Sequence, residues 1–408
     1  MKCKASSSFL FLTIPACVLA TTFAFGQTAS SQAPARLKGY TAVRPPVAAP
    51  GPMNASGPQL QVFHYKVTSS RDGNTYSGVM VGKDPFSSGS NKTSEIPTQI
   101  VPIVITTNSV GTSVNADGSI NTASGKTVLD PTVGNSACLA PPNDVPLTLF
   151  KQSPIFKHAN FSFGGTFVGK TQYLDAYQRA NFWSDIKGDN YHTYLRPLTI
   201  TKAVSINVPS NHGLSLATSA LGTPGFCAPL GIIDIDWLDT YLNEVVIPSL
   251  TSQGVNPGTF PIFLLANVVT AFPFDNLGGC CFLGYHSSNA GQTYSPMDFD
   301  TTGLFGPTVF DTSIASHETG EWMDDPFGGN PVPAWGHIGQ QGGCQTNLEN
   351  GDPLTGTDIP DVTMPNGYTY HLQELAFFSW FYGAPSTAVN GWYSNNNTFT
   401  TDAGAPCM

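Results

Sequence analysis

The pattern of apolar and polar residues becomes regular near residue 60. Alternation from Gln61 to Val67 predicts a strand, and the turn Asp72-Gly73-Asn74 connects it to a second β-rich run at Tyr76–Val81. A longer β-rich run follows at Ile96–Thr106. Its two prolines favour an edge or a bulged strand, because proline has no amide hydrogen to donate to a ladder.

Helical spacing appears farther along the chain. Large apolar side chains recur every three or four residues over Thr171–Ile186, which predicts a helix. Similar patterns predict strands at His192–Val208 and Pro261–Val269, and helices at Leu238–Leu250, Phe310–Met323 and His371–Tyr382. Helices and strands therefore interleave, and we expect an α/β fold, with α+β as the alternative.

The first residues have the pattern of a secretory signal. A basic start is followed by the apolar stretch Phe9–Phe25, and small residues flank Phe25 before a predicted cleavage after Gly26. We expect residues 1–26 to be removed and the mature chain to be secreted or periplasmic. Residues 27–58 are rich in Ala, Pro, Ser and Gly, which predicts a disordered linker or a short propeptide. Residues 59–408 then form a single domain, which could consist of two subdomains meeting near residues 310–325.

The composition limits the partners of the protein. Only 11% of the residues are charged, and 41 glycines and 33 prolines make the chain rich in turns. The net charge of −10 argues against nucleic acid and anionic membranes as partners. After the leader, no apolar run is long enough to span a bilayer, so we expect no membrane partner.

The cysteines predict disulfide bonds. Two of the eight lie in the leader, and the other six are an even number in an oxidising compartment. We expect the adjacent Cys280 and Cys281 to bond to different partners. No Cys-x-x-Cys pair occurs, which argues against a thiolate zinc site. The six candidates are Cys138, Cys227, Cys280, Cys281, Cys344 and Cys407.

The segment from Asp311 to Pro326 carries the clearest candidate chemistry. Asp311 favours the N-cap of a helix, and Pro326 ends it. Positions four apart lie on one helical face, so His317 and Glu321 can bind the same metal ion. Glu318 lies beside that face, where it could act as general base, as in the His-Glu-x-x-His helix of zinc peptidases.

A third ligand is expected downstream. The chain has only six glutamates, and three of them, Glu318, Glu321 and Glu349, fall between residues 318 and 349. We expect Glu349 to be the third ligand, with Asp352 as the alternative ligand or as a group that orients the others. The competing interpretation is a solvated helix face, together with an Asx-type turn at residues 349–352.

These motifs resemble a known family. Ser316-His317-Glu318-x-x-Glu321, Asp325-Pro326, Trp335 and Glu349-x-Gly351-Asp352 are similar to motifs of the Exordium-like (phosphate-induced) secreted proteins and of related bacterial zincin-like proteins. The resemblance covers about residues 311–352 and could extend back to Gly279-Cys280-Cys281 and Gly284-Tyr285-His286. It implies a secreted protein with a zincin-like, metallopeptidase-like core, in which His317, Glu321 and Glu349 bind the metal. A Gly- and Gln-rich insert between the helix and Glu349 departs from the pattern.

The ligand set also bears on the metal. One histidine and two glutamates neutralise a divalent ion, so water on the ion is less acidic than at a site with two histidines and one glutamate. We expect one divalent metal, Zn²⁺, although an oxygen-rich set also suits Mn²⁺ or Ca²⁺. His371, Tyr370, His337 and His286 are candidates for stabilising an oxyanion, although a structural role is the ordinary interpretation of each.

Other chemistries have weaker support. Gly-x-Ser-x-Gly does not occur, which argues against a serine hydrolase of that type. The pair Asp234 and Asp236 would suit a two-carboxylate hydrolase, but the isoleucines around it favour a strand end with capping aspartates.

The favoured function is a secreted metal-dependent peptidase that acts on a peptide or protein, with Glu318 as general base. We expect the metal helix to lie in a cleft between a β-rich N-terminal part and a C-terminal part. The alternative is a non-catalytic extracellular or cell-surface binding protein that holds a structural metal in the same pocket. A catalytic site keeps one coordination position open, whereas a structural site closes it.

Overall fold

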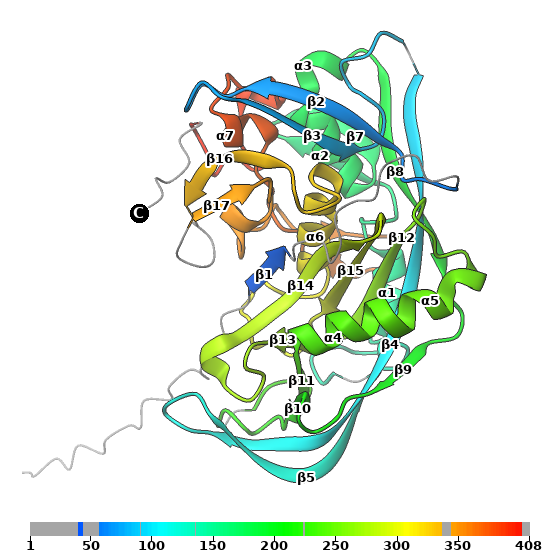
Figure 1. Ribbon diagram of the computed structural model, residues 1–408, viewed down its shortest axis with the longest axis vertical. Coiled ribbons are helices and arrows are strands. Elements are labelled where there is room, and N and C mark those ends of the chain that lie inside the picture. The colour runs from blue at the N-terminus through cyan, green and yellow to red at the C-terminus, as the bar shows by residue number, and fades with distance from the viewer. Residues whose placement is uncertain are drawn as a thin grey trace, which may run out of the picture. The chain divides into compact units, whose positions relative to one another are not determined.

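The computed structural model (Figure 1) describes the backbone of residues 40–43 and residues 57–89, 91–134, 136–222, 225–336 and 344–401. The predicted leader, His337 and Cys407 lie outside these residues. All elements described below belong to the unit Pro34–Met408.

Strand β4 (Asn91–Val114) is the long central strand of a large mixed sheet. Its first half runs parallel to β8 (Asn190–Thr199) and to β12 (Phe260–Ala266), so it is flanked on both sides. Its second half pairs with β9 (Val204–Asn207) and with the antiparallel β5 (Ile120–Leu129).

Seven strands of this sheet close into a barrel. Strand β15 pairs with β14 as well as with β12, so the order β14-β13-β11-β10-β4-β12-β15 returns to its start. The remaining strands of the ring are β10 (Gly213–Leu216), β11 (Leu230–Asp234), β13 (Val268–Ala271), β14 (Cys280–Asn289) and β15 (Gln292–Phe299).

The expectation of an α/β, zincin-like fold with a cleft between two parts is therefore wrong. Strands make up 40% and helices 19% of the described chain, and the closed barrel is its central feature. The sequence obscured this because several barrel strands are buried on both faces. Every residue of β12, β13 and β15 is buried, so these strands lack the alternation that marks a half-exposed strand.

The predicted edge position of the proline-containing run is also wrong, because β4 lies inside the sheet. Pro97 lies just before Thr98, where the ladder with β12 begins. Pro102 lies between Ile100, the last residue paired with β8, and Ile103, the first paired with β9. Both prolines thus lie where the ladder on one flank is interrupted, which explains why a missing amide hydrogen is tolerated there.

Short hairpins flank the barrel. The predicted pair of strands near residue 60 is confirmed, since β2 (Val62–Thr68) pairs with β3 (Thr75–Val81). The other two-stranded pairs are β6 (Ala159–Phe163) with β7 (Thr166–Thr171), β16 (Pro331–Gly336) with β17 (Cys344–Asn347), and β18 (Val362–Thr363) with β19 (Thr369–Tyr370).

Two of the predicted helices, over residues 171–186 and 238–250, are present but interrupted. The helix expected over residues 171–186 is broken at Phe182 into α2 (Tyr173–Asn181) and α3 (Trp183–Ile186). Asp234 caps α4 through its carboxylate, as expected of a strand end with capping aspartates. None of the described helices is long and apolar enough to cross a membrane.

The other helical elements are α1 (Pro146–Gln152), α4 (Ile235–Tyr241), the π-helical turn η1 (Leu242–Val246), α5 (Ile247–Leu250), and the turns η2 (Thr251–Gln253), η3 (Leu277–Gly279), η4 (Asp352–Leu354) and η5 (Val389–Gly391).

The predicted helix His371–Tyr382 is largely wrong. Only its end is helical, as α7 (Phe378–Tyr382), which stops at Gly383 with a φ of 62°. The preceding residues are held in bridges, one from Gln373 to Asp358 and one from Ala376 to Ser394. The conformation of these residues is set by the bridges to distant segments and not by the helical spacing of their aromatic side chains.

The disulfides differ from the expectation at the adjacent cysteines. Cys280 and Cys281 are bonded to each other, so the prediction of different partners is wrong. Cys138 is bonded to Cys227, which removes these two as partners, and Cys344 is also disulfide-bonded.

Helix α6 (Ser313–Asp324) carries the predicted metal motif. It contacts β14 and β15 of the barrel on one side and β3 and α2 on the other (Figure 1). The ring of Trp322 stacks on Phe260 with 3.8 Å between ring centroids, which fixes the helix to β12.

The N-cap of α6 is Thr312, and not Asp311 as predicted. The Asp311 side chain instead accepts from the amide of His371 at 3.1 Å, which ties the start of α6 to the segment after β19.

Candidate metal centre

Helix α6 is unusual because it is polar and yet entirely buried. All twelve of its residues are buried, including His317, Glu318 and Glu321. Charged side chains are almost never fully buried unless they are paired or coordinate a metal. The chemistry of this helix must therefore be explained by the groups that face it.

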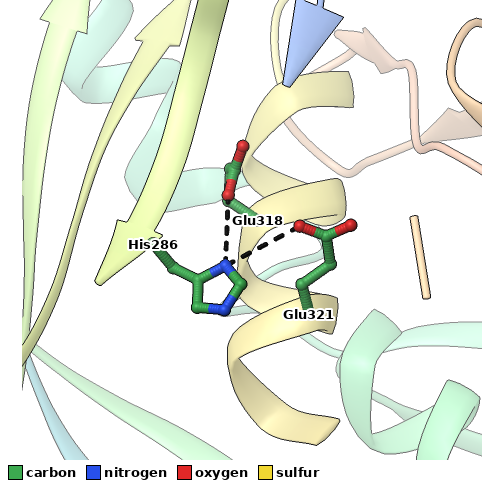
Figure 2. Close-up of side chains that lie close together, drawn as sticks. All are labelled: His286, Glu318 and Glu321. Carbon is green, nitrogen blue, oxygen red and sulfur yellow. Dashed lines mark ion pairs between the residues drawn. The ribbon is translucent and has the colours of Figure 1, made fainter. Parts of the chain in front are cut away.

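Strand β14 contributes a histidine to the helix (Figure 2). The Nε2 atom of His286 lies 3.1 Å from the backbone carbonyl oxygen of Asp325. A carbonyl can only accept, so Nε2 carries the hydrogen and Nδ1 carries the lone pair in the neutral ring. Nδ1 points toward the carboxylates of α6. A ring whose second nitrogen donates to a backbone carbonyl is a common arrangement of metal-binding histidines.

Three carboxylates converge on this nitrogen. The Nδ1 atom of His286 lies 3.5 Å from Oε2 of Glu318, 3.7 Å from Oε2 of Glu321 and 4.0 Å from Oε2 of Glu349. These separations exceed ordinary hydrogen-bond lengths. Ligands placed about 2.1 Å from a tetrahedral ion are about 3.4 Å apart, which is close to the observed spacing.

The converging atoms have no other partner. Nδ1 of His286, both oxygens of Glu318 and Oε2 of Glu321 and of Glu349 are buried and accept or donate no hydrogen bond in the described structure. Burying three carboxylates and one imidazole without hydrogen-bond partners would cost a large desolvation free energy. The ligand atoms of His286, Glu318 and Glu321 lie within 4.8 Å of one another, so these three residues fit a divalent cation, and Glu349 lies beside them at 4.0 Å from Nδ1 of His286.

Burial also changes the proton affinity of these groups. Burial raises the pKa of Glu318 to about 7, and it raises the pKa of Glu349 well above its usual range. Burial acts on Glu321 in the same direction, but the neighbouring His317 outweighs it and holds the pKa of Glu321 below its usual value. Burial also raises the pKa of Asp324, at the end of α6, to about 6, but Asp324 accepts from Tyr177, Gln178 and Asn350 instead of facing His286.

A second group shares Glu321. The Nε2 atom of His317 lies 2.9 Å from Oε1 of Glu321 and 3.5 Å from Oδ1 of Asp352, and these three side chains could also hold a metal. However, Oε1 of Glu321 already accepts from the backbone amides of Gly351 and Asp352, at 3.2 Å and 3.0 Å. The atoms around His286 are therefore the better candidate for a cation, and the second group holds the other oxygen of Glu321.

Two glycines allow the elements to approach so closely. A Cβ added to Gly284 of β14 would lie 2.9 Å from Cγ of Glu318. A Cβ added to Gly351 would lie 2.7 Å from the imidazole ring of His317. Only a residue without a side chain lets β14 and the loop after β17 pack directly on α6.

The structure gathers the residues predicted as ligands, and the predicted general base Glu318, into one cluster. His317, Glu318, Glu321, Glu349 and Asp352 are all fully buried in it. From the sequence, His286 was expected to be an oxyanion candidate and not a ligand. Its place beside the helix depends on the pairing of β14 with β15, which no local pattern predicts.

Of the predicted oxyanion residues, only His286 lies in the cluster among the described residues, and the others lie elsewhere or outside the described chain. Nδ1 of His371 lies 2.8 Å from Oδ2 of Asp311, and the Tyr370 hydroxyl donates to the carbonyl of Leu149 at 2.9 Å. Among the described contacts, neither reaches the cluster. His337 is not described.

The cluster is closed to solvent in this structure. His286, Glu318, Glu321 and Glu349 are each 0% exposed. A cavity of about 630 Å³ lies between residues 158–170 and 359–365, and none of the cluster residues lines it.

Comparison with known proteins adds no assignment. No protein-family model matches this chain, and no curated protein or solved structure is significantly similar to it. The resemblance based on residues 311–352 therefore remains a prediction.

Proposed function

We propose that this protein holds one divalent cation between α6, β14 and the loop after β17 and hydrolyses peptide bonds of exported polypeptides. The observation that carries the proposal is the convergence of Nδ1 of His286 and one oxygen each of Glu318, Glu321 and Glu349, all buried and without other partners. His286, Glu321 and Glu349 would hold the ion. Zn²⁺ and Mn²⁺ both suit one nitrogen and two carboxylates.

A divalent cation in this position would supply Lewis-acid activation of a water and of a scissile carbonyl. Glu318 is the general base in this scheme. It offers two buried oxygens with no hydrogen-bond partner, so it can take a proton from water and return it to the leaving amine. His317 supports the site by holding the second oxygen of Glu321.

The test compares Glu318→Gln with His286→Ala in the whole chain. We expect His286→Ala to lose the metal, measured by elemental analysis after dialysis against Zn²⁺ or Mn²⁺. Glu318→Gln should keep the metal and lose casein hydrolysis by about 100-fold or more, because the amide cannot accept the proton. Unchanged hydrolysis in Glu318→Gln would show that the catalytic assignment is wrong.

A second candidate function is a non-catalytic binding protein with a structural ion. The complete burial of the four side chains favours it, since structural sites are closed and catalytic sites keep an open position. In that case Glu318 is a fourth ligand, so Glu318→Gln should lower metal content and melting temperature together. The same variant therefore separates the two functions.

A further inference from the structure

A short strand from the N-terminal arm lies beside the metal-site strand. Strand β1 (Tyr40–Val43) runs parallel to β14, within the segment 27–58 that composition had suggested to be a linker or propeptide (Figure 1). Thr41 pairs with Gly284, and Val43 pairs with His286. Strand β1 therefore pairs with Gly284 and His286, the two residues through which β14 approaches α6.

This register brings β1 close to the candidate catalytic groups. Neighbouring strands in a sheet lie about 4.8 Å apart. Gly284 is in direct contact with the side chain of Glu318, and His286 directs its Nδ1 at the cluster. The backbone of β1 therefore lies one strand spacing from the backbone that touches the general base.

We infer that this edge of β14, at Phe282–His286, is a strand-addition site for an extended polypeptide, and that β1 occupies it as an internal inhibitory segment. The inference rests on the proposed function, and it names the substrate class as an extended, unfolded chain. Strand addition uses backbone hydrogen bonds, so such a site accepts many sequences.

Strand β1 has the properties expected of a segment that another extended chain could displace from β14. It lies at the end of the sheet order and pairs with β14 alone, whereas β14 itself is fixed by β13 and β15. It is four residues long, and Pro45 and Pro46 follow two residues after it in the sequence. Proline has no amide hydrogen to donate, so the ladder cannot extend far in that direction. A longer extended chain could therefore form more pairs than β1 does.

The cluster is buried while β1 is paired with β14. The side chains of His286 and Glu318 are 0% exposed with β1 paired to the strand that bears His286. A substrate that took this edge would need β1 to leave. The arm would then regulate access to the site without touching the cation.

The experiment weakens β1 by the double substitution Thr41→Pro and Ala42→Pro. The amides of successive strand residues point to opposite edges, so one of the two prolines removes a hydrogen bond to β14. The control carries Ala48→Pro and Ala49→Pro, in the same arm but outside β1. A fluorescein-labelled peptide with the sequence of residues 38–45 serves as the probe, and its binding is followed by fluorescence anisotropy.

We expect the β1 variant to bind the peptide at least 10-fold more tightly than the unmodified chain and the control. In hydrogen exchange without peptide, amides of residues 284–286 should exchange at least 10-fold faster in the β1 variant, while those of β12 should not change. Equal peptide binding and equal exchange in all three proteins would overturn the inference.

Casein hydrolysis with Zn²⁺ or Mn²⁺ separates this inference from the proposed function. Faster hydrolysis by the β1 variant supports both. Tight peptide binding without hydrolysis in any protein supports the strand-addition site and refutes the peptidase. Equal hydrolysis by all three proteins supports the peptidase and refutes inhibition by β1.

Discussion

The Nδ1 atom of His317 lies 2.9 Å from the side-chain oxygen of Gln373, which is 56 residues farther along the chain. The amide nitrogen of Gln373 donates to the carbonyl of Gly351 at 2.7 Å, so the side-chain oxygen is the acceptor and the imidazole is the donor. One glutamine thereby fixes both the ring that supports Glu321 and the loop that bears Glu349 and Asp352.

Gln373→Leu should therefore weaken metal binding without removing a ligand. We expect the affinity for Zn²⁺ to fall about 10-fold to 100-fold, as is typical when an outer partner of a metal site is lost. Competition with a chromogenic chelator measures this change. Gln292→Leu is the matched control, because Gln292 is a buried glutamine that donates to Thr259. An equal loss in both variants would indicate general destabilisation instead of a role at the metal.

The assignment of the cation to His286 distinguishes two histidines that are equally buried. His286→Ala should abolish stoichiometric metal binding, whereas His317→Ala should retain the metal with reduced affinity, because His317 acts through Glu321. Isothermal titration with Zn²⁺ and Mn²⁺ gives both values. Complete loss in His317→Ala, with binding kept in His286→Ala, would move the ion to the His317, Glu321 and Asp352 group.

Gly351→Ala tests the close packing of the loop on α6. The added methyl group would lie 2.7 Å from the His317 ring, so loop or ring must shift at a cost of about 1–3 kcal/mol. A lower melting temperature and weaker metal binding are expected together. Gly188→Ala is the control, since a Cβ there meets nothing within 4 Å. Equal melting temperatures of the two variants would contradict the packing described here.

Asp358 gives a prediction for pH. Burial raises the pKa of Asp358 to about 8, far above its usual value of 3.8. The folded protein thus binds this proton more tightly than the unfolded chain, and the associated stability is lost as pH rises from about 4 to about 8. Asp358→Asn should remove the loss and raise the melting temperature at pH 8.5 but not at pH 3.5. Because Asp358 is partly exposed, about 1–2 kcal/mol is expected. The exposed Asp361→Asn is the control for the loss of one carboxylate from the same region.

The sequence could place together only those candidate site residues that are close in the chain. His317 and Glu321 are four residues apart on one helix, so helical geometry alone brings them together. Glu349 and Asp352 could be proposed from the scarcity of glutamate. His286 could not be identified as a ligand, because its approach depends on β14 pairing with β15 and on Gly284 contacting Glu318. No local pattern encodes such a contact.

In the fold, too, pairing between residues close in the chain was predicted and pairing between distant strands was not. The β2–β3 hairpin joins neighbouring residues through a turn with clear signals, and it was predicted. The barrel joins strands that are far apart in the chain, such as β4 with β12, and several of these strands are buried on both faces. Their apolar runs do not reveal which strands pair, so the closed ring was not foreseen.

The length of β4 sets the order in which the protein can assemble. Its central residues Thr98–Pro102 pair with Phe260–Leu264, which are synthesised about 160 residues later. Until that segment emerges, one flank of β4 is an apolar edge with unpaired backbone groups, which favours pairing with another copy. Contacts of such long sequence separation also slow folding. A chain that must cross a membrane before it folds would therefore be most prone to aggregate in the interval between the release of β4 and the arrival of β12.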